Sequence, residues 1–153
     1  MVVHCSDHRF QPAFAEFIRD ELLLPPGHYV PLVFRGGAGN LARPHMEIDY
    51  AFVASCLNLH RNHSPEIERL VLITHENCRY YASLIREDGD HPDSQSQRDL
   101  AMLHPAIQEP ATPIEFASLV RKLDLRVEAY YARFLDDNQT AITFEPVKEG
   151  VPV

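Results

Sequence analysis

The chain has 153 residues, of which 45% are hydrophobic and 24% are charged, and its formal net charge is −8. These values are typical of soluble globular proteins, and no apolar run approaches the ~18 to 20 residues of a membrane span, so we expect one soluble domain over residues 1–153. The acidic balance and the scattered basic residues exclude nucleic acid and anionic membranes as expected partners. The N-terminus lacks a secretory signal pattern, so we expect a cytoplasmic protein.

The first predicted element is a strand at residues 2–4, and the motif Cys5-Ser6-Asp7-His8-Arg9 follows it directly. A helix is predicted from Pro12, because proline suits the first turn of a helix, and Pro25-Pro26-Gly27 ends it. The apolar residues that recur at helical spacing in this helix are Phe14, Phe17, Ile18 and Leu22.

A second strand is predicted over residues 29–34, and the loop Arg35-Gly36-Gly37-Ala38-Gly39-Asn40 follows it. The loop has neither the lysine of a phosphate-binding loop nor the G-x-G-x-x-G spacing, which favours a tight turn that lines a pocket over a nucleotide site. A helix over residues 47–60 comes next, and within it Cys56 is expected to be a buried core residue.

The second half alternates strands and helices in the same way. Its predicted elements are a strand at 70–74, the motif His75-Glu76-Asn77-Cys78, a short helix at 80–85, an exposed loop at 88–97, a long helix at 114–135 and a strand at 140–144. This alternation predicts an α/β fold, a single-domain and mostly parallel sheet flanked by helices.

Two motifs that follow predicted strands together contain two thiols and an imidazole, from Cys5, His75 and Cys78. Ligands gather at the carboxyl ends of parallel strands, so these side chains can converge although seventy residues separate them. Thiolate and imidazole are ligands that suit zinc, and three of them leave one position open for water. The alternative is three unrelated residues, two of them buried thiols.

Asp7 and Arg9 are candidates for a supporting role. Asp7 lies two residues after Cys5, a spacing that can bring its carboxylate to the side of the thiolate, where Arg9 can hold it by a charge-assisted pair. The alternative is a surface ion pair worth ~0 to 1 kcal/mol. His8 lies within this motif, and because histidine is the side chain that most often shuttles protons, it is a candidate for that role.

Taken together, these motifs resemble those of the β-class carbonic anhydrases. That family has C-x-D-x-R after its first strand, a Gly-Asn loop after its second and H-x-x-C after its third, and the resemblance covers about residues 2–86. It implies Zn²⁺ held by Cys5, His75 and Cys78, with Asp7 and Arg9 as catalytic residues. It also implies a pocket loop of Gly37, Gly39 and Asn40.

The implied activity is the reversible hydration of carbon dioxide to bicarbonate by zinc hydroxide. Two thiolates cancel the formal charge of the metal, so we expect activity to rise toward alkaline pH. A homodimer or higher homo-oligomer is also expected, with Tyr80, Tyr81 and the apolar side of residues 114–134 supplying surface for it.

The chain also departs from the family. His8 stands where a serine is common, Arg79 where a glycine is common and Gly36-Gly37 where the loop begins with Arg-Asn, and the N-terminal helices that wrap a partner are missing. Two alternatives therefore stay open. One is a non-catalytic zinc-binding or regulatory protein, and the other is a hydrolase of a related small electrophile such as carbon disulfide or carbonyl sulfide.

Overall fold

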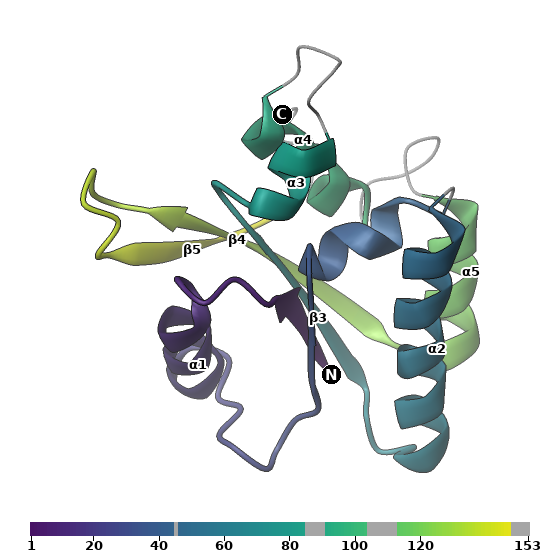
Figure 1. The fold of residues 1–153 in the computed structure, drawn as a ribbon. Coiled ribbons are helices and arrows are strands. Elements are labelled where there is room, and N and C mark those ends of the chain that lie inside the picture. The colour runs from purple at the N-terminus through teal and green to yellow at the C-terminus, as the bar shows by residue number, and fades with distance from the viewer. Residues whose placement is uncertain (45, 85–90, 104–112, 148–153) are drawn as a thin grey trace.

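The computed structural model describes residues 1–44, 46–84, 91–103 and 113–147. A five-stranded sheet in the order β2-β1-β3-β4-β5 forms its centre (Figure 1). All neighbouring strands are parallel except β5, which is antiparallel to β4. The strands are β1 (Val2–Cys5), β2 (Pro31–Phe34), β3 (Arg69–His75), β4 (Arg126–Phe134) and β5 (Ile142–Pro146). The predicted α/β class and mostly parallel sheet are confirmed.

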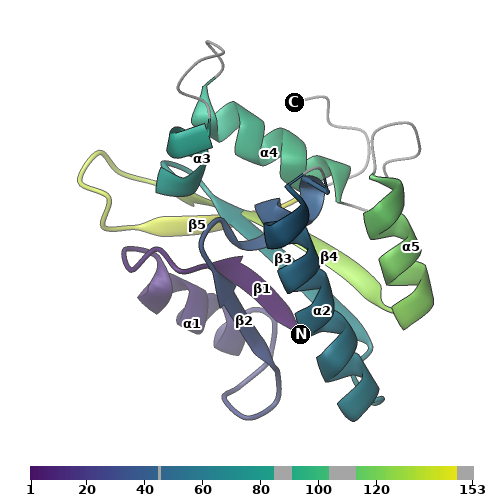
Figure 2. The ribbon, with the colours of Figure 1, turned by 45° about the vertical axis from the view of Figure 1, so that its right-hand side comes forward.

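Helices cover both faces of the sheet (Figure 2). Helix α1 (Gln11–Asp20) packs on one face, where its aromatic residues meet Val2 and Val71. The opposite face, which carries Val3 and Leu72, is covered by a larger cluster. That cluster draws on the 3₁₀ helix η1 (Gly37–Ala42) and on α2 (Glu47–His63), α4 (Pro92–Met102) and α5 (Ile114–Leu123). The short helix α3 (Arg79–Leu84) lies beside α4. In the described part of the chain, no helix is long and apolar enough to cross a membrane.

The predicted helix over residues 114–135 is wrong, because the segment forms α5 and then β4. The helix ends at Leu123, and the next residue, Asp124, adopts a left-handed conformation with φ of 51° that lets the chain turn into the strand. Beyond it Val127, Ala129 and Tyr131 are buried in alternation, which is the period of a strand. No glycine or proline separates the helical segment from the strand. The apolar residues of both therefore read as one long helical stripe in the sequence.

The predicted loop at residues 88–97 is also wrong for the part that the structure describes, since α4 begins at Pro92. His91 caps this helix by accepting a hydrogen bond from the backbone N–H of Asp93. Leu100 packs in the core, and Ser96 and Asp99 are also fully buried. The segment was predicted to be a loop because its composition is polar, but it forms a helix that buries one side.

The burial of three residues, Cys56, Tyr80 and Tyr81, also differs from the prediction. Cys56 is half-buried and packs against the edge of the core rather than within it. Tyr80 and Tyr81, expected to supply interface surface, are buried inside the chain. Exposed apolar side chains gather instead on α2, where Ile48 and Phe52 are 85% and 59% exposed.

Candidate metal centre

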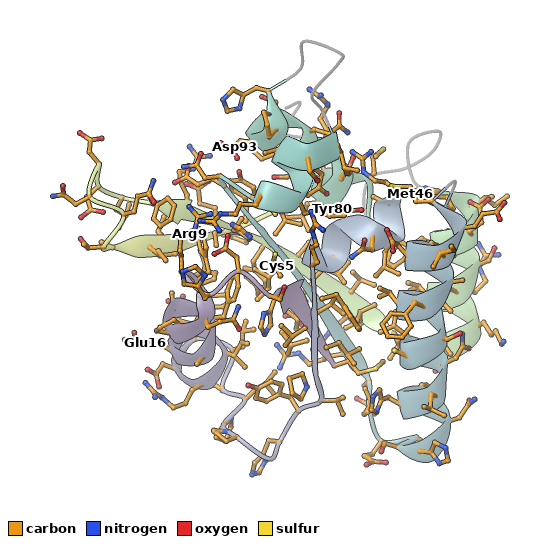
Figure 3. The ribbon with its side chains drawn as sticks, viewed as in Figure 1. Cys5, Arg9, Glu16, Met46, Tyr80 and Asp93 are labelled. Atoms are coloured by element: carbon orange, nitrogen blue, oxygen red, sulfur yellow. The ribbon has the colours of Figure 1, made fainter. Side chains whose placement is uncertain are left out.

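The two cysteine and histidine motifs meet at the carboxyl edge of the sheet. Cys5 is the last residue of β1, His75 is the last residue of the neighbouring β3, and Cys78 stands just before α3. Figure 3 labels Cys5 at this edge, together with Arg9 and Tyr80. All three candidate ligands are buried, and their ligand atoms lie within 4.8 Å of one another. The predicted convergence of Cys5, His75 and Cys78 is confirmed.

The spacing and the protonation of this group fit a tetrahedral metal ion. The two Sγ atoms are 3.9 Å apart, and zinc–sulfur bonds of ~2.3 Å at a tetrahedral angle place two sulfurs ~3.8 Å apart. The Nδ1 atom of His75 is 2.8 Å from the carbonyl oxygen of Glu76 and donates its proton there. The buried Nε2 atom of His75 has no hydrogen-bond partner. An imidazole fixed in this tautomer by a carbonyl is a typical metal ligand.

The two cysteine sulfurs share one proton through a hydrogen bond. The pKa of Cys5 is lowered to about 4, chiefly because the thiol of Cys78 donates a hydrogen bond to its sulfur, and the backbone N–H of Asp7 also favours the thiolate. The pKa of Cys78 is raised, because it keeps the shared proton and because it is buried. This environment therefore favours a thiolate at Cys5, a form that attracts a cation.

Asp7 lies beside the group without joining it. Its Oδ1 and Oδ2 accept hydrogen bonds from Arg9 Nε at 3.0 Å and Arg9 Nη2 at 2.7 Å, and its Oδ1 also accepts from the backbone N–H of Arg9. The side chains of Arg9 and Asp7 are 24% and 7% exposed, so this pair is not an exposed surface ion pair. The bidentate contact with Arg9 lowers the pKa of Asp7 to about 2. Asp7 therefore stays ionised across the physiological range.

Two contacts that sequence reasoning missed hold this pair in place. Arg9 Nη2 also donates to the carbonyl oxygen of Asn77 at 2.7 Å, which ties the first motif to the second. The side-chain amide of Gln11 donates to the carbonyl oxygens of Cys5 and Asp7 at 2.9 and 2.8 Å. Gln11 opens α1, so the helix start fixes the turn between the thiol and the carboxylate.

The glycine loop packs directly against the site. Gly37 has φ of +52°, and a Cβ atom there would lie 2.5 Å from the backbone nitrogen of Cys5. A Cβ atom on Gly39 would lie 2.0 Å from the hydroxyl of Tyr81. The side-chain amide of Asn40 donates to the carbonyl oxygens of Arg35 and Gly37, so it closes the loop on itself. Most of the loop belongs to the 3₁₀ helix η1, and glycine is required at Gly37, where it touches β1.

Aromatic side chains enclose the histidine on the α1 side. The ring of Phe10 lies 4.1 Å from the ring of His75, and the Phe134 ring lies 4.7 Å from that of Phe10. His4 is buried against Phe14, and burial lowers its pKa. His8, the residue considered for a proton shuttle, is exposed on the turn after β1. The imidazole of His75 thus has an apolar wall on one side.

Helix α4 contributes two carboxylates that sequence reasoning missed. Asp93 Oδ1 accepts a hydrogen bond from the backbone N–H of Asn77 at 2.5 Å. Asp99 Oδ2 accepts hydrogen bonds from the hydroxyl of Tyr81 and from Arg43 Nε, both at 2.9 Å. The signal that was available is Pro92-Asp93, a pattern typical of the first turn of a helix.

The comparison with known protein families finds no family model that matches this chain, and the comparison with curated proteins finds no match. The family resemblance therefore rests on the sequence motifs alone.

Proposed function

We propose that this chain is a zinc protein similar to the β-class carbonic anhydrases that reversibly hydrates carbon dioxide to bicarbonate. The observation that carries the proposal is the buried cluster of Cys5, His75 and Cys78, in which His75 Nε2 has no partner, beside a carboxylate that is not a member of the cluster. A purely structural metal site has no evident need for the Asp7 and Arg9 pair.

The donor set favours zinc over harder metals. Cys5, Cys78 and His75 Nε2 are the atoms that would hold the ion, and Asp7 is occupied by Arg9. Zinc held by these three residues would make a water molecule more acidic and would polarise the substrate as a Lewis acid. Two thiolates weaken this effect because they cancel the charge of the metal, so activity is expected to rise between pH 7 and 9.

The residues around the metal ligands supply orientation. Asp7 remains an ionised acceptor, because Arg9 lowers its pKa, and it can accept a hydrogen bond from the reacting water. Arg9 holds both carboxylate oxygens, so the carboxylate plane is fixed relative to Cys5, which lies two residues earlier. The carboxylate would orient the water toward carbon dioxide.

The test combines metal analysis with stopped-flow carbon dioxide hydration at pH 7 to 9. The wild-type protein should contain about one zinc per chain. Cys78→Ala should lower the metal content, because the variant loses one of three ligands. Asp7→Asn should keep its zinc and lose about 100-fold or more of its hydration rate. Asp20→Asn is the matched control, since Asp20 forms an exposed pair with Arg19 on α1.

The outcomes separate the rival functions. A protein that takes up no zinc or similar metal would refute the metal site itself. A zinc-loaded protein without hydration activity would favour the non-catalytic role, and hydrolysis of carbon disulfide or carbonyl sulfide in its place would identify the related electrophile. Equal hydration by Asp7→Asn and wild type would reject the assigned role of Asp7.

A further inference from the structure

We infer that α4 positions the metal ligand Cys78, and that Asp93 and Asp99 are the positioning residues. The inference rests on the proposed metal site and adds two carboxylates, which accept hydrogen bonds from residues on either side of Cys78. Each fixes one end of the segment from Asn77 to Tyr81, which contains Cys78. Figure 3 labels Asp93 on α4, above the edge where Cys5 lies.

Asp93 fixes the backbone immediately before Cys78. Asn77 has φ of 52°, a left-handed conformation that asparagine adopts more readily than most residues other than glycine. Its N–H donates to Asp93, and its carbonyl oxygen accepts from Arg9. Both backbone polar groups of Asn77 are therefore held by side chains from outside the loop. These contacts set the direction in which the chain enters Cys78.

Asp99 fixes the chain just after Cys78. Its carboxylate is fully buried and accepts hydrogen bonds from Arg43, Tyr81 and Gln95, so its charge is neutralised by Arg43. The Arg43 guanidinium also lies over the Tyr81 ring, 5.5 Å from its centroid. The Tyr81 hydroxyl occupies the space that a side chain at Gly39 would fill, so it packs directly against the backbone of η1. The first turn of α3 is therefore locked in place three residues beyond Cys78.

These contacts act on the sulfur through the backbone. The N–H groups of Tyr80 and Tyr81 favour the thiolate of Cys78, so a shift of α3 would move these donors as well as the sulfur. Cys78 stands just before the six-residue helix α3 and packs in a small buried cluster with Cys5, Tyr80 and Tyr81, so its position depends on how this helix is held. Residues that support the ligands of a metal site in this way typically contribute 10- to 100-fold to metal affinity.

The test measures zinc affinity by competition with a chromophoric chelator, and the absorption spectrum of the cobalt-saturated protein. Asp93→Ala removes the acceptor for Asn77 and should weaken zinc binding by about 10- to 100-fold, and Tyr81→Phe should do the same from the other end. Asp93→Asn keeps an acceptor oxygen and should restore an affinity close to wild type. The thiolate-to-cobalt band should change shape in Asp93→Ala and Tyr81→Phe even at saturation.

The matched control is Leu100→Ala, which removes a fully buried core side chain from the same helix. It should lower the unfolding midpoint while leaving zinc affinity and the cobalt spectrum close to wild type. The inference is overturned if Asp93→Ala and Tyr81→Phe bind zinc as tightly as wild type. It is also overturned if zinc affinity falls with stability in Leu100→Ala to the same degree as in those two variants. Absence of metal binding by the wild type would instead refute the proposed function, and the positioning role with it.

Discussion

Two neighbouring residues at the end of β1 have different environments. Cys5 belongs to the candidate metal centre, whereas His4 packs on Phe14 beneath α1 and its Nδ1 lies 3.1 Å from the carbonyl oxygen of Cys5. Burial disfavours the charged imidazolium and lowers the pKa of His4 below the ordinary value of 6.5. His4 is therefore a neutral packing residue in the folded protein.

This predicts an acid-side loss of stability. Because the unfolded chain binds the His4 proton more tightly than the folded chain, the free energy of unfolding should fall as the pH drops below 6.5 toward the lower folded pKa. Urea unfolding at several pH values between 7.5 and 5 measures this slope. His4→Asn should make the slope shallower, whereas His8→Asn, an exposed neighbour, should not. An equal slope in wild type and His4→Asn would contradict the assignment.

The contact between the glycine loop and β1 links two elements through backbone rather than side chains. Gly37 and Gly27 both have positive φ, but only Gly37 has backbone atoms of β1 where a side chain would go. A substitution at Gly27 adds conformational strain alone, whereas one at Gly37 adds a collision with Cys5. Substitutions at Gly27 and Gly37 can therefore be compared to separate the free-energy cost of the backbone conformation from the cost of displacing Cys5.

Gly27→Ala is expected to lower the free energy of unfolding by about 1 to 2 kcal/mol and to leave zinc content unchanged. Gly37→Ala should lower the free energy of unfolding further, because the added methyl group forces Cys5 or the loop to move, and it should also reduce zinc content. Chemical denaturation and metal analysis of both variants provide the comparison. Full zinc occupancy in Gly37→Ala would show that the loop can yield without disturbing Cys5.

Elements with a single clear period could be predicted from sequence, and those with mixed signals could not. The buried strand at residues 70–74 and the helix that Pro12 opens correspond to β3 and α1. The turn at Asp124 was missed because a left-handed aspartate is a weak sequence signal compared with glycine.

Cys5, His75 and Cys78 were found because parallel strands bring their ends together. Asp93 and Asp99 were not, because their role depends on how α4 packs.

At the scale of the whole molecule, one edge of the sheet offers a surface for self-association. Among the described residues β2 is an edge strand, and one side of its backbone has no neighbouring strand there. Val33 on β2 and Phe52 on α2 are exposed, and both line a groove of about 550 Å³ together with Phe34 and Leu84. Arg35 and Asp49 give this groove charges of both signs, so two copies related by a two-fold axis can present opposite charges to each other. The groove also includes Tyr80, two residues after Cys78, which places it close to the metal centre.

We therefore predict a homodimer through β2 and α2, rather than through Tyr80, Tyr81 and the C-terminal segment. Phe52→Glu should shift the protein from dimer to monomer in light scattering at micromolar concentration, because it places a charge in the apolar contact, and its zinc content should be unchanged. Leu135→Glu, at a similarly exposed apolar residue just beyond β4, should remain dimeric. A wild-type protein that is monomeric and binds zinc would contradict this interface. Such a monomer would leave the groove beside Tyr80 open to solvent, and would favour the non-catalytic role, because the family resemblance implies an active pocket close to a subunit interface.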